Sequence, residues 1–377
     1  MKRLLTALLS ITILGLVIWF IMPNHLIKTA IHQHPGIYDY KIFNNRTVES
    51  EVAEPWPLSN QYNSKELSRA ILDSLKSLNT TAYLIIQNDS ILFEYYGDEE
   101  QISAKSNSFS VAKSIVALLI GIAIDEEDIQ SIDLTVDELL PQYENLHNHH
   151  LTLKDILTMS SGTSWDENYG SVFSITTKAY YGNNLSRLMK GLTIKEKPGV
   201  KFEYRSGDTQ LLAAILKEAT GKSLSEYASK KLWKKTGAEK AALWSLDKAK
   251  GTEKAYCCFN SNARDFARIG NLVLKKGKWN NKEIISESFI KEMITPAYHL
   301  KDSKGEVVDY YGYQWWIKNY KDLTIPYARG ILGQYIYIIP EKNSVIVRLG
   351  HKRSDEKIGA HPIDSYTWIN GALEILN

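Results

Sequence analysis

The sequence of 377 residues predicts an α+β fold, in which a β-sheet is interrupted by an inserted helical lobe. Runs rich in β-branched and aromatic residues occur at 80–97 and return between 311 and 351. A mostly helical pattern fills 109–232 between them. Strands at both ends of a domain with helices in the middle indicate one sheet with a helical insertion. A third observation, an apolar run at the N-terminus, adds one transmembrane helix in front of the domain.

The first 23 residues predict a signal anchor. Lys2 and Arg3 precede nineteen uncharged residues, and Pro23 ends the run. The run is long enough to cross a bilayer, and it exceeds the apolar stretch of about 7–15 residues found in most cleavable signal peptides. We therefore expect an uncleaved helix over 1–23 with its basic end in the cytoplasm, which places the catalytic part in the bacterial cell envelope, outside the cytoplasm. A cleaved signal peptide, and hence a secreted protein, is the alternative.

The rest of the chain is expected to form a spacer and one domain. Residues 24–65 are polar, aromatic and interrupted by prolines without a clear period, which is typical of a spacer. The domain is expected over 66–377. Its first element is a hairpin within 80–97, because the residues Asn88-Asp89-Ser90 separate two β-rich runs.

The helical lobe is expected over about 109–232, with helices that end at glycines. The stretch 208–221 shows the pattern, because Asp208 can cap its start and Gly221 lies just past its end. Another amphipathic helix follows within 257–277. The chain then returns to strands.

The C-terminal part predicts an antiparallel hairpin and a last helix. The runs 334–341 and 344–351 are rich in β-branched and aromatic residues, and they flank a short turn. A helix over roughly 363–376 closes the chain.

The overall composition is that of an ordinary globular protein, with 44% hydrophobic and 23% charged residues. Forty-five basic residues against 43 acidic ones leave a net charge of +2, which gives no reason to expect a nucleic acid partner. The two cysteines, Cys257 and Cys258, are adjacent. Neighbouring residues rarely reach disulfide geometry, so we expect no disulfide bond and two small buried side chains.

Ser110 and Lys113 form an S-x-x-K pattern in front of the apolar run IVALLIGIAI. A helix that is apolar all round is normally buried, and a buried ammonium is costly unless it is paired or gives up its proton. Residues three apart share a helical face, so the lysine nitrogen can reach the serine oxygen. A helix N-terminus favours negative charge on that oxygen, and burial lowers the lysine pKa towards that of a usable base. The pair therefore predicts covalent acyl transfer.

Two further stretches supply candidate partners. Tyr204 and Ser206 lie on a loop in front of a helix, and their side chains share one side of an extended segment. A phenol close to an ammonium has its ionised form favoured, so we expect Tyr204 to relay protons to and from Ser110. Gly330 and Gly333 precede a strand and allow backbone N–H groups to approach a ligand. An N–H from this edge and that of Ser110 would form an oxyanion hole.

Together these motifs resemble one family. The S-x-x-K at 110–113, the Y-x-S at 204–206 and the glycine-rich edge within 327–341 are similar to the serine β-lactamase and penicillin-binding-protein superfamily. The likeness covers roughly 66–377, and it is closest to the class C-like branch, particularly 6-aminohexanoate-dimer hydrolases and related esterases. The resemblance implies a mainly antiparallel sheet flanked by helices, plus an all-helical lobe, with the active site between them.

The resemblance also implies roles for the residues that match its motifs. Ser110 would be the nucleophile, Lys113 its base or proton partner, and Tyr204 the proton relay to the leaving group. Ser206 stands where many relatives carry asparagine.

Three further positions are implied at the substrate. Ile331 would supply the second N–H of the oxyanion hole beside that of Ser110, and Gly330 would keep that edge open. Tyr169 falls where the amide-hydrolysing relatives carry a tyrosine that holds the leaving amine.

The sequence departs from the family at the edge strand. β-Lactamases and transpeptidases carry K-T-G or H-T-G there to bind a substrate carboxylate, and the corresponding residues here are Ala328-Arg329-Gly330. Arg329 can replace that positive charge only if it points into the cleft. The departure favours an esterase or an amidase that acts on a small ester, amide or short peptide-like substrate. A β-lactamase or D-alanyl peptidase is the alternative.

Other classes of protein find less support. No G-x-S-x-G motif occurs, which argues against a Ser-His-Asp elbow. The histidine-rich stretch 147–150 has no matching ligand cluster, and the stretch 220–223 lacks the earlier glycine of a phosphate loop at Leu216. We therefore expect no metal and no cofactor. A non-catalytic, membrane-anchored binding or sensor protein remains as the alternative of another class.

Overall fold

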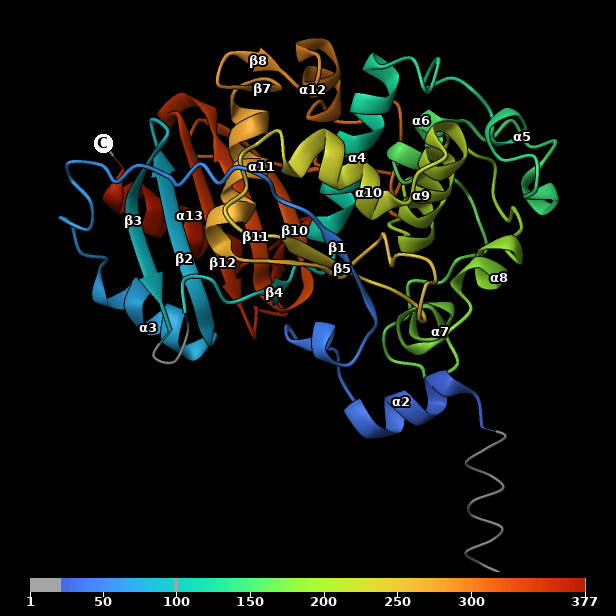
Figure 1. Cartoon of the computed structure of the whole chain (residues 1–377), viewed down its shortest axis with the longest axis horizontal. Coiled ribbons are helices and arrows are strands. Elements are labelled where there is room, and N and C mark those ends of the chain that lie inside the picture. The colour runs from blue at the N-terminus through green and yellow to red at the C-terminus, as the bar shows by residue number, and fades with distance from the viewer. Residues whose placement is uncertain (1–21, 98–100, 377) are drawn as a thin grey trace, which may run out of the picture.

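The computed structural model describes residues 22–97 and 101–376. A large β-sheet lies on one side of the molecule, and most of the helices gather on the other (Figure 1). The sheet has six antiparallel strands in the order β3-β2-β12-β11-β10-β9. Their bounds are β2 Thr80–Gln87, β3 Ser90–Tyr96, β9 Trp316–Tyr320, β10 Leu323–Gly330, β11 Gln334–Ile339 and β12 Ser344–Gly350.

Strands from the two ends of the domain meet inside this sheet. β2 pairs with β12, with Ile86 opposite Val345 and Ile85 opposite Ile346. These β-branched side chains are fully buried on both faces, which suits a strand in the middle of a covered sheet. The prediction that N-terminal and C-terminal strands form one sheet, with helices inserted between them, is confirmed.

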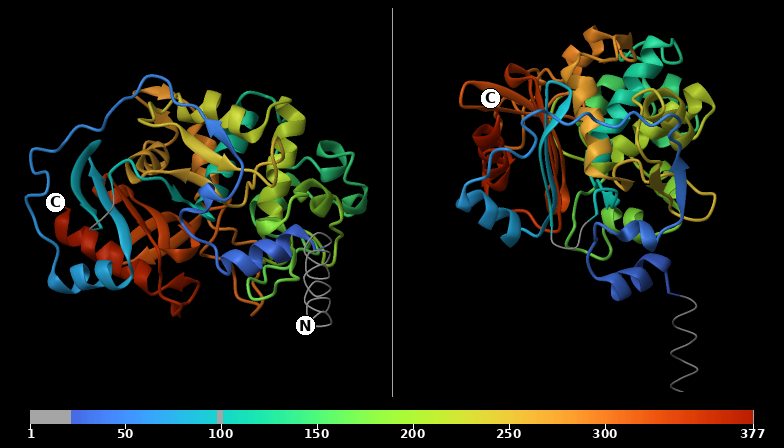
Figure 2. Two further views of the ribbon diagram at one scale, coloured as in Figure 1. Left: turned by 60° about the horizontal axis from the view of Figure 1, so that its bottom comes forward. Right: turned by 60° about the vertical axis from the view of Figure 1, so that its left-hand side comes forward.

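Helices cover both faces of the sheet, as the edge-on view of Figure 2 shows. One face carries α11 (Ala263–Leu274), and the other carries α3 (Arg69–Ser77) and α13 (Asp364–Ile375). α11 approaches closely at Gly270, where a Cβ would lie 2.5 Å from Val345 Cγ1. A larger residue would push the helix off the sheet.

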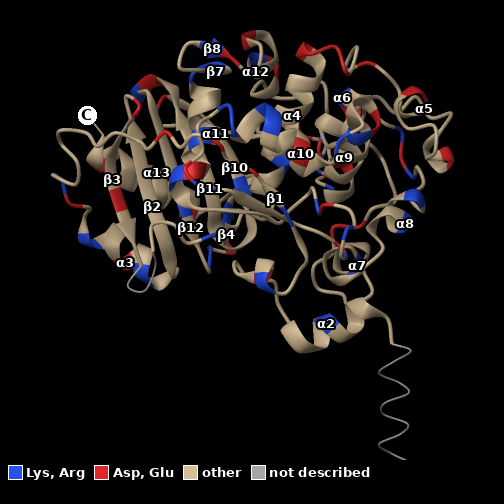
Figure 3. Ribbon diagram, in the orientation of Figure 1, with Lys and Arg blue, Asp and Glu red and all other residues tan. Residues whose placement is uncertain are grey.

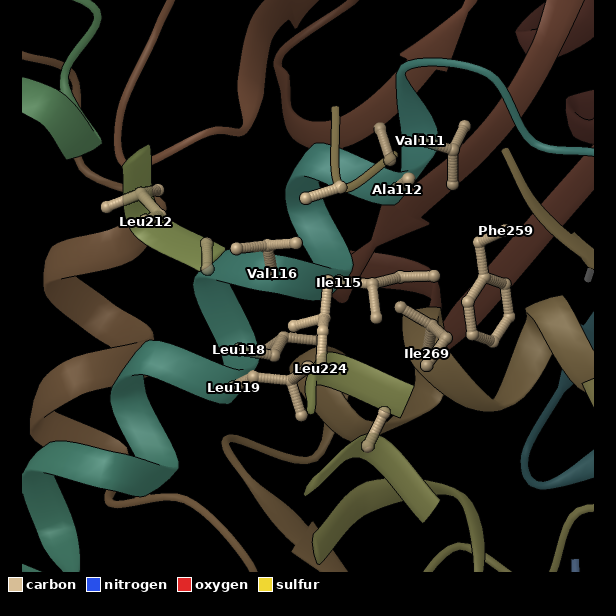
Figure 4. Packing of buried hydrophobic residues seen from close by; sticks show 14 of the residues in the cluster. Val111, Ala112, Ile115, Val116, Leu118, Leu119, Leu212, Leu224, Phe259 and Ile269 are labelled. Carbon is tan, nitrogen blue, oxygen red and sulfur yellow. The ribbon is translucent and has the colours of Figure 1, made fainter. Parts of the chain in front are cut away.

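α4 (Val111–Asp125) is the central helix of the molecule, and every residue from Val111 to Ala123 is buried. Its side chains pack against Leu212 of α9 (Ser206–Thr220) and against Phe259 and Ile269 on the side of the sheet (Figure 4). The other helices are α2 Asn24–His32, α5 Val136–Leu139, α6 Leu153–Leu157, α7 Ile175–Tyr181, α8 Leu185–Lys190, α10 Leu224–Ala228 and α12 Glu287–Met293. The apolar run of the sequence therefore forms the interior wall between the two halves of the fold.

Smaller sheets complete the architecture. A four-stranded antiparallel sheet has the order β1-β5-β6-β4, and its strand β1 comes from the segment 24–65, which packs on the domain. The limits predicted for the spacer, the domain and the helical lobe stay predictions. The remaining bounds are β1 Asn45–Val48, β4 Ser106–Asn107, β5 Ala242–Ser245, β6 Phe259–Ser261, β7 Lys278–Trp279, β8 Lys282–Glu283, β13 Lys357–Ile358 and β14 His361–Pro362.

Basic and acidic residues are both scattered over the two halves of the molecule (Figure 3). This mixture agrees with the small net charge of +2.

The transmembrane helix in the predicted fold class has to be corrected. Within 22–97 and 101–376, no helix is long and apolar enough to cross a membrane. The longest helices of this part, α4 and α9, have 15 residues each. At about 1.5 Å per residue they measure about 22 Å, short of the roughly 30 Å of a bilayer core. Residues 1–21 of the predicted span 1–23 lie outside the described residues. The part of the predicted fold class that remains is the α+β domain.

Candidate active site

Ser110 stands on a sharp backbone turn in front of α4. Phe109 has a backbone φ of 45°, which residues other than glycine rarely adopt. Its N–H donates to Asn107 Oδ1 at 2.9 Å. The next residue, Ser110, is the N-cap of the helix. Such strain persists only where the surroundings hold it, and it clusters at functional sites. The turn places the Ser110 hydroxyl at the N-terminus of α4, where the helix dipole favours negative charge.

Lys113 lies one turn further along α4, and its side chain is buried. Its Nζ lies 3.3 Å from Ser110 Oγ, 3.0 Å from Ser206 Oγ and 2.8 Å from the carbonyl oxygen of Tyr256. Burial lowers the pKa of Lys113 to about 8, against the opposing charges of Glu167 and Asp208. The amine can therefore accept a proton from Ser110 near neutral pH and hold it with three oxygen acceptors.

Tyr204 lines the same cavity as Ser110, and Lys113 Nζ lies 5.1 Å from the centre of its ring. The expectation that the ammonium favours an ionised phenol is wrong. Burial, and then the charge of Glu167, raise the pKa of Tyr204. The phenol therefore stays protonated, which suits a group that gives a proton to a leaving atom.

Glu167 is a site residue that the sequence reasoning missed. Its Oε1 accepts from Ser206 Oγ at 2.6 Å, and its Oε2 accepts from the Ser206 N–H at 2.7 Å. Trp165 Nε1 donates to Oε2 at 2.8 Å. The half-exposed Tyr169 donates its hydroxyl to Oε1, so it reaches the site through Glu167. Ser206 thus links a carboxylate to the ammonium of Lys113, and an acidic residue two positions before Tyr169 was the available signal.

Asp208 lies behind this network. The predicted helix cap at Asp208 is wrong, since α9 already starts at Ser206 and Ser161 Oγ donates to Asp208 Oδ1 at 2.5 Å. Burial raises the pKa of Asp208 to about 7. The predicted end of this helix is confirmed, because Gly221 follows it with a φ of 67°.

The end of β10 closes against the Ser110 turn. A Cβ on Gly330 would lie 2.3 Å from the carbonyl oxygen of Ser108 and 3.2 Å from Phe109 Cβ, so only glycine allows this approach. Ile331, the next residue, lines the same cavity as Ser110. From the sequence we expected the N–H of Ile331 to be the second donor of an oxyanion hole at this place.

The cavity at Ser110 has a volume of about 280 Å³. Five aromatic residues line it, namely Tyr169, Phe202, Tyr204, Tyr310 and Trp316. Arg329 also lines the cavity, with its Cζ 3.5 Å above the ring of Trp316 and its Nη1 donating to the Ala360 carbonyl at 2.9 Å. Arg329 therefore points into the cleft, as it must if it replaces the positive charge of the family motif.

The predicted absence of a disulfide bond is wrong. Cys257 and Cys258 are bonded to each other, and both are buried as expected. Cys258 has a φ of 68°, a turn conformation that could not be read from the sequence when we expected adjacent cysteines to stay unpaired. The bond follows directly after Tyr256, whose carbonyl accepts from Lys113.

Metal ligands do not gather at this site. Within the described part of the chain, no three His, Cys, Asp or Glu side chains lie close enough together to hold a metal ion.

The chain is similar to several known proteins. The chain is similar to the 6-aminohexanoate-dimer hydrolase of Paenarthrobacter ureafaciens, with 25% identity over 290 residues, 73% of each chain. A Bacillus anthracis structure, whose description proposes a 6-aminohexanoate-dimer hydrolase, superposes with a TM-score of 0.73 at 22% identity, over 90% of this chain and 92% of that one. A family VIII carboxylesterase superposes with a TM-score of 0.66 at 14% identity, over 86% and 100%. At these identities the two structures show the fold alone.

The resemblance to the serine β-lactamase and penicillin-binding-protein superfamily is thereby confirmed. The family model described as Beta-lactamase matches residues 76–363, which is most of the chain. This chain belongs to the beta-lactamase family of hydrolases.

Proposed function

We propose that the protein is a serine hydrolase that cleaves an ester or an amide through an acyl-enzyme on Ser110. One observation carries the proposal. A buried lysine with a pKa of about 8 holds its nitrogen 3.3 Å from the hydroxyl of a serine that opens onto a cavity. The names of the related 6-aminohexanoate-dimer hydrolase and carboxylesterase support the same reaction class.

Acylation begins when the neutral amine of Lys113 takes the proton of Ser110. The serine oxygen then attacks the substrate carbonyl carbon and forms a tetrahedral intermediate. Its negative oxygen would be held by the backbone N–H groups of Ser110 and Ile331. The intermediate collapses when the bond to the leaving atom breaks and Tyr204 gives that atom its proton. The proton that Lys113 took from Ser110 then passes to Tyr204, which leaves a neutral amine and a neutral phenol beside the acyl-enzyme.

Deacylation uses the same groups in reverse. Water enters where the leaving group stood and gives a proton to the neutral amine of Lys113 as it attacks the acyl carbon. The bond to Ser110 Oγ then breaks, the serine oxygen takes that proton from the ammonium of Lys113, and the acid product departs. The charge that passes through Lys113 in each half is balanced by Glu167, which reaches it through Ser206.

The first test is covalent labelling by a fluorophosphonate probe. Wild-type protein should be labelled at Ser110, and Ser110→Ala should abolish both labelling and turnover of 4-nitrophenyl butyrate. Ser77→Ala, a matched change on the exposed face of α3, should retain both. Labelling that survives in Ser110→Ala would refute the assignment. A wild-type protein that is neither labelled nor active would favour the non-catalytic alternative.

A second candidate function is hydrolysis of a β-lactam or a D-alanyl peptide, and the position of Arg329 favours it. The guanidinium lines the cavity at the strand where those enzymes bind a substrate carboxylate. The esterase or amidase remains the first candidate, because the lysine of K-T-G is replaced by Ala328, whose side chain is apolar and buried. Rapid hydrolysis of nitrocefin, faster than that of 4-nitrophenyl butyrate, would reverse this order.

A further inference from the structure

The disulfide between Cys257 and Cys258 adjoins one of the contacts that hold the catalytic lysine. Tyr256, the residue before it, accepts from Lys113 Nζ through its carbonyl oxygen at 2.8 Å, the shortest hydrogen bond of that nitrogen among the described residues. The other two acceptors are side-chain hydroxyls, which rotate about a single bond. A carbonyl oxygen moves only with the backbone, so the position of this acceptor depends on the turn that leads into the two cysteines.

Both ends of this turn are fixed to the same strand residue. The Lys254 N–H donates to the carbonyl of Ser245 on β5, and the carbonyl of Cys258 accepts from the Ser245 N–H, each at 2.9 Å. Between these two hydrogen bonds the Cys257 N–H donates to the Lys254 carbonyl at 3.1 Å and closes a turn with Tyr256 at one of its central positions. Because the ends are held, a change of a dihedral angle within the segment has to be absorbed by the peptides around Tyr256.

The disulfide holds an unfavourable dihedral angle inside this segment. Cys258 has a φ of 68°, in the left-handed region, and such a conformation persists only while the surroundings impose it. The bond to Cys257 is the covalent constraint that spans this residue. With two thiols in place of the bond, the φ of Cys258 is free to relax, and the carbonyl of Tyr256 then turns away from Lys113.

Tyr256 also contacts the acidic side of the network. The centre of its ring lies 6.0 Å from that of Trp165, whose Nε1 donates to Glu167. A movement of the turn therefore weakens the hold on Lys113 from two directions and leaves both carboxylates in place. The charged and titratable groups that face Lys113 are the carboxylates of Glu167 and Asp208 and the phenols of Tyr204 and Tyr256.

We propose that the Cys257–Cys258 disulfide is a redox switch of the active site, in which the oxidised pair positions the Tyr256 carbonyl on Lys113 and reduction to two thiols lowers the activity. Neither cysteine lines the cavity at Ser110, so both are positioning residues. The inference rests on the proposed function, because the switch acts through the base of the proposed reaction.

A small dithiol is the reductant that fits the site. Both cysteines are buried, so the reductant reaches the bond during local opening of the turn. One of its thiolates attacks a sulfur of the disulfide, the S–S bond breaks, and a mixed disulfide forms. The second thiol of the reductant then attacks that mixed disulfide. The reductant leaves as its own disulfide, and its two electrons and two protons remain on the thiols of Cys257 and Cys258.

The experiment compares the oxidised and the reduced wild type as full chains. The protein is treated with dithiothreitol under native conditions, freed of it under nitrogen and assayed at once with 4-nitrophenyl butyrate over a range of pH. An aliquot denatured in N-ethylmaleimide should gain two labels by mass, because the chain has two cysteines.

We expect reduction to lower the plateau value of kcat/KM about tenfold or more, because the base is no longer held in place. The acid limb of the pH–rate profile should move to lower pH by about one unit. The Tyr256 carbonyl stabilises the ammonium, so its loss lowers the pKa of Lys113, and the neutral amine persists to lower pH. Reoxidation with oxidised glutathione should restore both quantities.

Variants assign the effect to the two sulfurs. Cys257→Ser combined with Cys258→Ser cannot close the bond, so its profile should match that of the reduced wild type and should not respond to dithiothreitol. Ser77→Ala keeps both cysteines, and it should respond as the wild type does. If the double variant fails to fold, the reversal of the wild-type effect on reoxidation carries the test.

Four results would overturn the inference. The first is a native wild type that gains no label after dithiothreitol, and the second is one that carries two thiols and keeps its kcat/KM. The third is a loss on reduction that the double variant shows as well. The fourth is a lower plateau with an unmoved acid limb, which would indicate general loosening. Because the oxidised wild type is measured in parallel, these outcomes differ from failure of the proposed function, in which the oxidised enzyme hydrolyses no ester.

Discussion

Replacing Glu167 by glutamine should move the acid limb of the pH–rate profile to lower pH. The proton on Lys113 is stabilised by Glu167 through Ser206, across hydrogen bonds of 3.0 Å and 2.6 Å. These distances place the two charges at most about 5.6 Å apart. With an effective dielectric constant of about 20, their attraction is about 3 kcal/mol, and solvent at the partly exposed carboxylate reduces it towards half. Removing the negative charge should therefore lower the pKa of Lys113 by about one to two pH units.

The sign of the shift follows from which form of the lysine reacts. The neutral amine is the base, so kcat/KM of the wild type should fall below the pKa of Lys113, which is about 8. In Glu167→Gln the neutral amine persists to lower pH, so the acid limb should move to lower pH. The plateau value of kcat/KM should also fall, because glutamine holds Ser206 less firmly. The assay is hydrolysis of 4-nitrophenyl butyrate, followed at the isosbestic wavelength of nitrophenol.

Asp166→Asn is the matched control, because Asp166 is adjacent, exposed and carries the same charge. Its acid limb should stay with that of the wild type. An unmoved limb in Glu167→Gln, or one that moves to higher pH, would refute the electrostatic role of Glu167.

Three further changes test other parts of the structure. Lys113→Ala should lower turnover of 4-nitrophenyl butyrate about a hundredfold or more, the size of a general-base effect, and a near-normal rate would make the lysine structural. Tyr204→Phe should cost an alkyl ester far more kcat than a nitrophenyl ester, whose leaving group needs no proton; equal losses would contradict the acid role. Lys254 is buried, its Nζ has no hydrogen-bond partner among the described residues, and burial lowers its pKa to about 7. The unfolded chain binds this proton more tightly, so the free energy of unfolding should rise from pH 7 to about pH 10. Lys254→Met should raise the free energy of unfolding at neutral pH by of order 4 kcal/mol. Thermal melts measure the effect, with Lys248→Met at an exposed lysine as the control.

Local spacing explains why part of the site could be predicted. Ser110 and Lys113 lie one helical turn apart, so their contact follows from the helix itself and from the apolar run behind it. The sheet that joins N-terminal and C-terminal strands was predictable for a similar reason, because β-rich runs and hairpin turns are local signals.

Contacts between distant segments could not be read in the same way. Glu167 and Ser206 are 39 positions apart, and only the folded loop brings the carboxylate to the helix start. The direction of Arg329 depends on the strand register, which places it opposite Tyr335. The expected ionisation of Tyr204 was wrong for the same reason, since the sequence showed the neighbouring ammonium and showed neither the burial of the phenol, which raises its pKa most, nor the carboxylate of Glu167.

The apolar helix α4 and the carboxylate of Glu167 act on Lys113 in opposite directions, and the site needs both. Burial alone would depress the pKa of the lysine further and leave an amine too weak to take the serine proton. Glu167 and Asp208 alone, beside an exposed lysine, would hold it protonated at neutral pH. Their sum leaves a pKa of about 8, within reach of the pH at which such a base works. Burial in the apolar helix therefore lowers the pKa of Lys113, and the carboxylate of Glu167 behind Ser206 limits how far that pKa falls.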